Sequence, residues 1–443
     1  GERHGFKVFS WQFPNMTQEL AQELLPECPK EELPITRNKN DEEEKLPVYI
    51  DFSHPRAKEL LAAQWKDRMD AGIRGSMVDF GDVVPDEAVF YDGRRGDEMH
   101  NAYAYQYAKN YRELFEQKYG DDHVLYTRGA APGSQHFACQ FGGDQLTSFQ
   151  GLKYAIAGGL SAAASGLPFW GVDAGGYDGF PDQETYLRWT EYAAFCPLMR
   201  FHGTEPREPW EYDAFTVKVY RYYTWLRENL RPYIVSVAAE AHKLGIPMMR
   251  PLAMMYPEDQ EATKVWDEYL FGEDLLVAPV SDETEEREIY FPEGRWISLW
   301  NLNDEISGPV QRSVEVPIDK IPVYIREGSF LPLRLNENLK LGESMSESET
   351  EMILAVVPQN DSIVKCCGME KNGETIQLQI SGRTAELYVM LAGIHWKNTE
   401  AIVNGRTLTK VTAREGLYFT EGYLELEEGI LVKINPSAES VIK

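Results

Sequence analysis

The stretch GSMVDFGD, at residues 75–82, decides the fold, because it begins as a short buried strand and that strand ends in the acidic residue Asp79. Apolar residues at helical spacing predict a helix before it, over residues 55–71, and another after it, over residues 97–118. A strand set between two such helices is typical of a parallel sheet, because parallel neighbours need a long crossover connection.

The same strand–helix unit recurs over the first 255 residues. Further strands are expected at residues 7–11, 48–51, 124–126, 137–141, 168–173 and 247–250, and further helices at 155–164, 183–195, 213–228 and 230–244. Repeated units of this kind indicate an α/β fold with a parallel sheet. We therefore expect residues 1–255 to form a (β/α)8 barrel that lacks its N-terminal strands, with residues 247–250 as its last strand.

The pattern changes after residue 255. Helical periodicity fades, and short β-rich runs follow one another between turn signals such as Pro292-Glu293-Gly294. The acidic, serine-rich run ESMSESETE at residues 343–351 is typical of a linker or surface loop. We expect two β-sandwich domains after the barrel, a proximal one over residues 256–340 and a distal one over residues 341–443.

Composition and charge exclude several classes of partner. With 44 basic and 71 acidic residues the formal net charge is −27, so the field of the protein repels nucleic acid. No run of about 18 apolar residues is present, which argues against a membrane span. The five cysteines are odd in number and lack metal-site spacing, and a cytoplasmic location is expected.

Polar residues recur where the expected barrel strands end. They are Asp79, Arg128, Asp144, Asp173 and His202. In a (β/α)8 barrel these strand ends surround one active site. Cleavage of a glycosidic bond with retention needs two carboxyl groups about 5–5.5 Å apart, one ionised as nucleophile and one protonated as general acid. Two acids at the ends of different strands fit this requirement.

The segments VDFGD, containing Asp79, and FGGDQ, containing Asp144, resemble glycoside hydrolase family 31, which holds α-glucosidases, α-xylosidases and sulfoquinovosidases. The resemblance covers roughly residues 5–335. It implies that Asp79 is the nucleophile and that Asp144 is the general acid/base, whose pKa must be raised for the first step. A retaining α-glycosidase that acts through a glycosyl-aspartate intermediate is therefore expected, and the same intermediate permits transglycosylation.

Three further segments resemble the same family in the same order. They are PFWGVDAGGY at residues 168–177, LMRFHGTEPREPW at 198–210 and FGEDLLVAPV at 271–280. The resemblance implies substrate contacts from residues of the motifs and strand ends, namely Phe80, Arg128, Trp170, Asp173, Tyr177 and His202. It implies no metal and no cofactor, and the histidines and acids show no metal-site spacing.

Each of these residues also has a structural interpretation. Asp79 could cap the next helix, and Asp173 could bind the backbone amides of the glycine turn that follows it. Arg128 could pair with one of the acids and tune its pKa. Trp170, Tyr177 and His202 could belong to the core, while Asp82 could form hydrogen bonds around the nucleophile.

Two departures from the family pattern leave alternatives open. The chain lacks the β-domain and first barrel strands that precede residue 7 in relatives, so a second polypeptide or a cleaved N-terminal half is expected to complete the barrel. The sugar is undecided: an α-glucoside or α-xyloside is favoured, and a sulfoquinovoside is the alternative suggested by Asp144-Gln145 and Gly175-Gly176-Tyr177. A non-catalytic sugar-binding subunit with the same barrel is the rival from another class.

Overall fold

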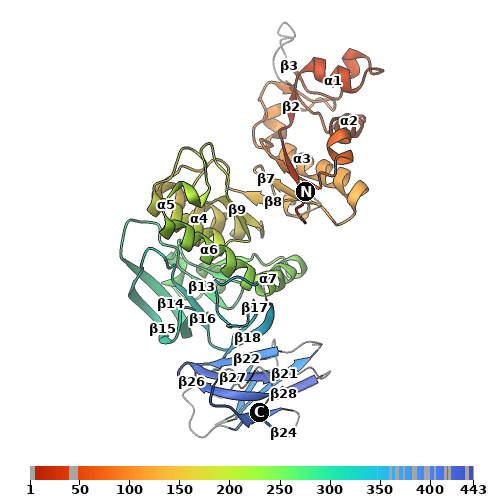
Figure 1. The fold of residues 1–443 in the computed structure, drawn as a ribbon. Coiled ribbons are helices and arrows are strands. Elements are labelled where there is room, and N and C mark those ends of the chain that lie inside the picture. Colours follow the sequence, from red (N-terminus) through yellow and green to blue (C-terminus); the bar gives the residue numbers. More distant parts are fainter. Residues whose placement is uncertain are drawn as a thin grey trace. The chain divides into compact units, whose positions relative to one another are not determined.

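The structure is a computed structural model of the 443-residue chain. It describes residues 5–38, 48–346, 348–358, 362–364, 369–372, 375–381, 387–393, 400–403, 406–413, 417, 421–434 and 439–442. The chain divides into two compact units, and we describe each by itself (Figure 1). The first unit comprises residues 1–143 and 165–171, and the second comprises residues 144–164 and 172–443.

A parallel sheet forms the centre of the first unit. Its strands pair in the order β1-β5-β7-β8-β9. Neighbouring strands from β1 to β9 are parallel, with Trp11 opposite Met77 and Met77 opposite Tyr126. The strands are β1 (Phe9–Gln12), β5 (Gly75–Val78), β7 (Val124–Thr127), β8 (Cys139–Phe141) and β9 (Trp170–Asp173), and β10 (Leu198–Arg200) belongs to the second unit. The predicted parallel sheet is confirmed, and its strands carry Asp79, Arg128, Asp144 and Asp173 at or just beyond their carboxyl ends.

Strand β5 begins at a position that only glycine can occupy. A Cβ atom on Gly75 would lie 2.1 Å from the ring of Phe9 and 2.6 Å from the carbonyl oxygen of Val124. Both neighbouring strands therefore approach the backbone of β5 closely. This close packing fixes β5 between β1 and β7 and fixes the direction in which the chain leaves it toward Asp79.

Two helices cover this sheet and confirm the predicted ones. They are α2 (Ala57–Asp70) and α3 (Gly96–Tyr119). Tyr103, Tyr107 and Tyr111 of α3 are four residues apart, lie on one face and are fully buried. They belong to a core cluster that also contains Trp65 of α2, whose indole N–H donates to the hydroxyl of Tyr111 at 3.2 Å.

The second unit begins with four helices, and two of them start at side-chain caps. Asp182 accepts a hydrogen bond from the backbone of Thr185, and Asp213 accepts one from Thr216, each at 2.8 Å. The last of these helices ends at Gly245, which has a left-handed φ of 73°. The helices are α4 (Phe149–Ala164), α5 (Gln183–Ala194), α6 (Ala214–Asn229) and α7 (Arg231–Leu244).

The β-rich stretch that follows forms one six-stranded antiparallel sheet in the order β11-β12-β13-β16-β14-β15. The strands are β11 (Met249–Pro251), β12 (Tyr269–Phe271), β13 (Leu275–Val277), β14 (Glu286–Ser298), β15 (Asn301–Glu315) and β16 (Val323–Arg326). The prediction of a last barrel strand at residues 247–250 is wrong, because β11 pairs antiparallel with β12. All three of its residues are buried. The sequence pattern therefore indicated burial correctly, but it did not indicate which strand would pair with this one.

The distal part is a two-sheet β-sandwich. One sheet has the order β17-β18-β22-β27-β26-β25 and the other the order β19-β20-β21-β28-β23-β24. A common core contains Val389 and Val432 of the first sheet and Met369 and Ile376 of the second. The strands are β17 (Phe330–Leu335), β18 (Thr350–Val356), β19 (Ser362–Val364), β20 (Met369–Asn372), β21 (Thr375–Ser381), β22 (Leu387–Ala392), β23 (Ile402–Val403), β24 (Arg406–Thr407), β25 (Thr409–Lys410), β26 (Gly422–Leu426), β27 (Gly429–Ile434) and β28 (Glu439–Ile442).

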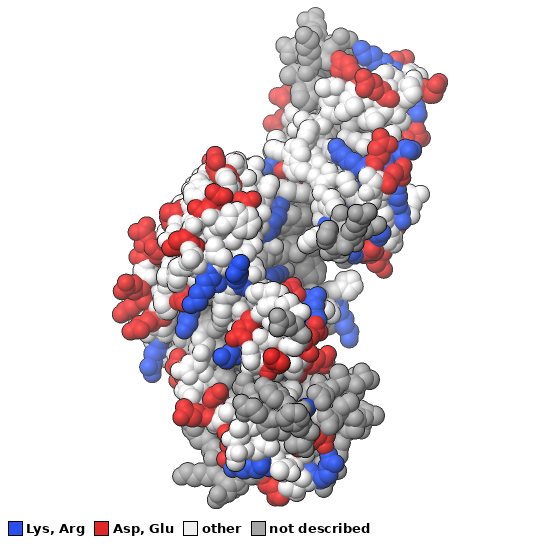
Figure 2. Space-filling view, in the orientation of Figure 1, with Lys and Arg blue, Asp and Glu red and all other residues white. Residues whose placement is uncertain are grey.

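Short elements complete the two units. They are α1 (Gln18–Leu24), β2 (Asn15–Met16), β3 (Arg37–Asn38), β4 (Val48–Tyr49), β6 (Ala88–Val89) and α8 (Leu252–Met255). None of the helices among the described residues is long and apolar enough to cross a membrane. Figure 2 shows acidic side chains gathered on the side of the second unit where β14 and β15 lie, and Glu286, Glu288, Asp304 and Glu305 are exposed on these two strands.

Candidate active site

The carboxylate of Asp79 is buried and held by hydrogen bonds in the first unit. It follows β5 directly, and its own backbone N–H donates to the carbonyl oxygen of Gln12 at 2.7 Å. The indole N–H of Trp11 donates to Oδ2 at 3.0 Å, and the backbone N–H of Phe80 donates to Oδ1 at 2.9 Å. Only 5% of Asp79 is exposed. Donors to both oxygens therefore hold the carboxylate in one orientation.

Arg128, which follows β7, faces the same carboxylate. Its Nε lies 3.4 Å from Oδ1 of Asp79 and 3.4 Å from Oδ1 of Asp82. The guanidinium also lies over the ring of Phe80, 4.3 Å from the ring centroid. The structural interpretation of Arg128 as the partner of an acid therefore agrees with the geometry, and Asp82 joins the same group.

The turn after Asp79 is sterically confined. Phe80 has a φ of 60°, in the left-handed region that residues with a Cβ rarely adopt. A Cβ atom on Gly81 would lie 2.6 Å from the ring of Tyr107, and one on Gly129 would lie 2.8 Å from the backbone nitrogen of Asp82. The turn is thus packed between α3 and the segment after β7, and it presents the half-exposed ring of Phe80 beside Asp79.

Asp173, at the end of β9, is a buried acid of the second unit. Only 1% of it is exposed, and Arg200 forms an ion pair with it from the end of β10. Burial raises the pKa of Asp173 to about 6; Arg200 opposes this rise, whereas the charge of Asp144 adds to it. Asp144 itself is exposed just beyond β8, so its charge acts on Asp173 within the same unit.

Arg207 fixes the glycine-rich segment after Asp173. It is 6% exposed, and its guanidinium donates to the carbonyl oxygens of Gly176 at 2.8 Å, Tyr177 at 3.1 Å and Gly179 at 2.7 Å. Gly175, Gly176 and Gly179 all have φ values between 77° and 93°. The buried guanidinium of Arg207 therefore fixes the segment 175–179 through its carbonyl oxygens. The backbone conformation of this segment requires glycine at three positions.

The remaining predicted site residues lie at or near the surface. The rings of Tyr177 and His202 are in contact, with centroids 5.4 Å apart, and His202 is exposed rather than part of the core. Trp170, in the first unit, is partly buried, and its indole N–H has no hydrogen-bond partner among the described residues. The described residues contain no group of three or more His, Cys, Asp or Glu that could hold a metal ion.

The structure thus groups the predicted residues within each unit. Asp79, Phe80 and Arg128 contact one another in the first, while Asp173 interacts with Asp144, and His202 contacts Tyr177, in the second. Sequence reasoning missed Trp11, Arg200 and Arg207. Trp11 lies in the strand expected at residues 7–11, and Arg200 and Arg207 lie in the segment 198–210. Trp11 and Arg200 are also at or near the carboxyl ends of strands, and this position could have identified them as site residues.

Comparison with known proteins identifies two family domains. The domain described as "Glycosyl hydrolases family 31 TIM-barrel domain" matches residues 2–237. The domain described as "Glycosyl hydrolase family 31 C-terminal domain" matches residues 245–331. The first match covers Asp79, Asp144 and every other predicted site residue.

Three known proteins illustrate the relationship. An isomaltosyltransferase of Sporosarcina globispora is 36% identical over 320 residues, which are 68% of this chain and 29% of that protein. An α-xylosidase of Emericella nidulans is 32% identical over 294 residues, 64% of this chain and 38% of that protein. The chain therefore spans well under half the length of both relatives.

The third is a solved structure. The cycloalternan-forming enzyme of Listeria monocytogenes superposes with a TM-score of 0.88, covering 100% of this chain and 46% of that one. Its sequence identity is 24%, so this likeness concerns the fold.

Proposed function

Because the chain belongs to glycoside hydrolase family 31, we propose that it is the catalytic part of a retaining α-glycosidase with Asp79 as nucleophile and Asp144 as general acid/base. The observation that carries the proposal is the environment of Asp79. A buried carboxylate with N–H donors on both oxygens is held in one orientation, which a nucleophile that attacks a single carbon atom requires.

The reaction proceeds in two displacements. An oxygen of Asp79 attacks the anomeric carbon, the glycosidic C–O bond breaks, and the leaving oxygen takes the proton of the Asp144 carboxyl group. A water molecule then attacks the same carbon, Asp144 takes its proton, and the ester bond to Asp79 breaks. If a sugar hydroxyl attacks instead of water, the outcome is transglycosylation.

Phe80, Arg128, Trp170, Asp173, Tyr177 and His202 form the substrate contacts of this proposal. Arg128 and Asp173 carry charges that bind sugar hydroxyls more strongly than neutral groups do. The rings of Phe80, Trp170 and Tyr177 offer flat apolar faces to a pyranose. Because Asp173 is ionised mainly above its pKa of about 6, its affinity for a hydroxyl donor rises through that pH.

An α-glucoside or α-xyloside is the favoured substrate. Support comes from the Phe169-Trp170-Gly171 segment and from relatives named isomaltosyltransferase and α-xylosidase. The alternative is a sulfoquinovoside, supported by the Asp144-Gln145 and Gly175-Gly176-Tyr177 segments. A panel of aryl α-glucoside, α-xyloside and α-sulfoquinovoside assayed with the native protein decides between them by the highest kcat/KM.

The test of the two catalytic roles compares Asp79→Ala with Asp144→Ala. We expect Asp79→Ala to lose about 10⁴-fold or more in kcat on every substrate of the panel, because no ester can form. Asp144→Ala should lose similarly on a glycoside with a poor leaving group, yet recover most of its kcat/KM on a glycosyl fluoride, because the first displacement of fluoride needs no proton from Asp144. Equal losses of both variants on the fluoride would contradict the assigned roles.

The rival function is a sugar-binding subunit without catalysis. It predicts that the native protein binds a sugar of the panel while turnover of all three aryl glycosides is absent. Intact catalytic residues argue against it, because a scaffold has no need of a buried, hydrogen-bonded Asp79. Turnover that disappears in Asp79→Ala would exclude the rival.

We also propose a further polypeptide, or a cleaved N-terminal part, that pairs with β1. Phe6, Val8, Phe9 and Trp11 on and before this strand are 47–72% exposed, and β1 comes first in the order of its sheet. An exposed apolar edge strand is a template for pairing with another strand. Native mass measurement on the purified, active protein tests this: a 50.6 kDa monomer with full activity would refute it.

A further inference from the structure

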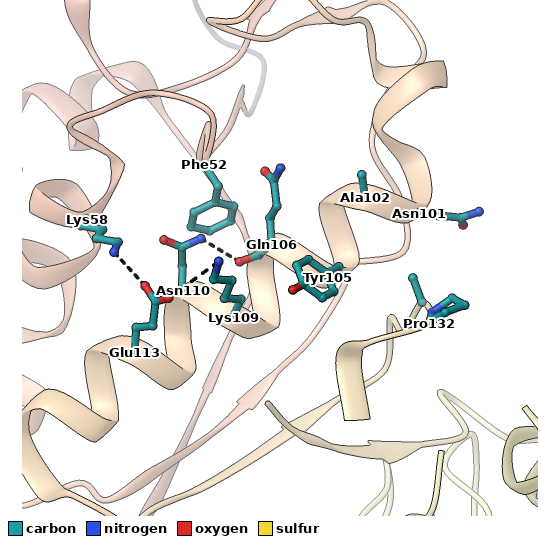
Figure 3. Close-up of a pocket in the computed structure, with 11 residues that line it drawn as sticks. Phe52, Lys58, Asn101, Ala102, Tyr105, Gln106, Lys109, Asn110, Glu113 and Pro132 are labelled. Carbon is teal, nitrogen blue, oxygen red and sulfur yellow. Dashed lines mark hydrogen bonds and ion pairs between the residues drawn. The ribbon is translucent and has the colours of Figure 1, made fainter. Parts of the chain in front are cut away.

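The first unit contains a pocket away from the Asp79 group. Its volume is about 520 Å³, within the range of small-molecule sites. Figure 3 shows it along one side of α3. It is lined by Phe52, Lys58, Asn101, Ala102, Tyr105, Gln106, Lys109, Asn110, Glu113, Ala131 and Pro132.

The walls of the pocket come from well-packed elements. Seven of its residues lie on α3, on a side distinct from the buried stripe of Tyr103, Tyr107 and Tyr111. Phe52 comes from the segment before α2, Lys58 from α2 itself, and Pro132 from the segment after β7. The shape of the pocket is therefore fixed by the same packing that holds α2 and α3 on the sheet.

The lining combines aromatic rings with amide side chains. Phe52 and Tyr105 provide flat apolar faces, and Figure 3 shows the Gln106 side chain extending between these two rings. Asn101, Gln106 and Asn110 add amide groups that both donate and accept hydrogen bonds. This is the chemistry that recognises a pyranose, which has an apolar face and a rim of hydroxyl groups.

One polar atom of this lining lacks a partner. Oε1 of Gln106 is buried and accepts no hydrogen bond from the described residues. A buried acceptor without a donor destabilises the protein. The terminal amide of Gln106 holds an acceptor and two donors, and the side chain lines the pocket, so it offers hydrogen bonds to a ligand hydroxyl there.

The charges favour a neutral ligand. Glu113 lies 2.8 Å from the ammonium group of Lys58 and 4.0 Å from that of Lys109, so one carboxylate compensates both cations in part. Figure 3 shows both contacts at one end of the pocket, away from Asn101 and Pro132. The chain as a whole carries a charge of −27, which disfavours an anionic ligand further.

We propose that this pocket is a second carbohydrate site that binds a neutral hexopyranose unit of a glucan. The sugar stacks on Phe52 and Tyr105, and its vicinal hydroxyls bond to the amides of Gln106 and Asn101. Such a site retains a polymeric ligand on the protein independently of the chemistry at Asp79.

Electrophoresis of the native protein in gels containing a soluble glucan tests the site. Dextran, amylopectin and xyloglucan serve as neutral polymers, and dextran sulfate serves as the anionic comparison. The variants are Tyr105→Ala and Gln106→Leu, with Gln117→Leu, on an exposed part of α3 outside the pocket, as the matched control. Because Gln106→Leu removes a buried unsatisfied group, it should fold at least as well as the native protein.

We expect at least one neutral polymer, and not dextran sulfate, to retard the native protein and Gln117→Leu. Tyr105→Ala and Gln106→Leu should bind that polymer about tenfold more weakly, the loss expected for one hydrogen bond or stacking contact. Their kcat/KM on a small aryl glycoside should stay within about twofold of the native value. Retardation of Gln106→Leu equal to that of Gln117→Leu would overturn the proposal, as would the absence of retardation by all three neutral polymers.

Discussion

Asp79 and Asp173 occupy equivalent places in their units, but the protein stabilises them differently. Each is an almost fully buried carboxylate at the carboxyl end of a parallel strand. Asp79 receives an indole N–H and a backbone N–H in addition to the contact with Arg128. Asp173 depends on the ion pair with Arg200, and burial raises its pKa to about 6.

The difference shows that two acids buried to a similar degree can be stabilised by different kinds of contact. Neutral N–H donors solvate a carboxylate without bringing a second buried charge, whereas an ion pair requires both groups to lose water. Asp79 therefore has an environment in which neutral donors contact both of its oxygens and Arg128 adds one cation. Asp173 has the environment of a group poised to gain or lose a proton near neutral pH.

The largest contrast is expected between Arg200→Met and Arg128→Met. Removing Arg200 leaves the Asp173 carboxylate buried without its counter-cation, and such losses cost about 3–5 kcal/mol. Removing Arg128 should cost less, because Asp79 keeps its N–H donors. Denaturant unfolding of both variants at pH 8 measures the two losses. Equal destabilisation would show that the donors to Asp79 do not replace a cation.

The next prediction concerns the pH dependence of stability. Because folding raises the pKa of Asp173 from its ordinary value of 3.8 to about 6, the native state binds more protons than the unfolded state between these values. The free energy of unfolding should therefore fall as pH rises from about 4 to about 6, by roughly 3 kcal/mol in total for two pKa units.

Asp173→Asn removes this contribution and provides the comparison. The native protein should lose stability relative to Asp173→Asn as pH rises from 4 to 7, in denaturant unfolding at matched ionic strength. The same substitution at an exposed acid, Glu87→Gln, controls for the general effect of charge. A difference between native protein and Asp173→Asn that does not change with pH would show that Asp173 keeps an ordinary pKa in spite of its burial.

How far the sequence predicted these environments depends on the range of the interactions. Periodicity located β5, α2, α3 and α5 well, since each carries its own apolar face and its own start and stop signals. The motifs marked Asp79 and Asp173 and left open whether Arg128 pairs with an acid, but they did not mark Trp11 or Arg200 as partners. Trp11 contacts Asp79 and Arg200 contacts Asp173, but each pair is far apart in the sequence. Only the pairing of strands brings these residues together, so no local sequence pattern predicts the contacts.

The failure at β11 has the same cause. All three of its residues are buried, Arg250 included, and burial is expected of a strand in either sheet. Its partner β12 follows 18 residues later in the chain, at Tyr269, and only the antiparallel ladder identifies it. The sequence also did not predict that Arg128 contacts both Asp79 and Asp82. These contacts depend on which strands are neighbours in the sheet, and the sequence does not give that order.

A smaller effect is expected from Trp11→Phe. The substitution keeps a ring at this position but removes the N–H that donates to Oδ2 of Asp79. Hydrogen bonds to charged groups contribute about 1.5–3 kcal/mol, so kcat/KM on an aryl glycoside should fall about 10- to 100-fold. Trp266→Phe, at an exposed tryptophan of the second unit, is the control and should leave kcat/KM unchanged. An unchanged rate in Trp11→Phe would mean that Asp79 is oriented by its other two partners.

The smallest effect concerns the ring of Phe80 above Arg128. Phe80→Leu keeps a side chain at the left-handed position, so the backbone strain is unchanged, but it removes the aromatic face that lies 4.3 Å from the guanidinium. A cation–π contact of this kind contributes about 0.5–1 kcal/mol. Thermal unfolding should therefore show a loss of about that size in Phe80→Leu and almost none in Phe80→Tyr, which keeps the ring. Equal losses of stability in both variants would show that Asp79 and Asp82 alone hold Arg128. The ring of Phe80 would then contribute to substrate binding and not to stability.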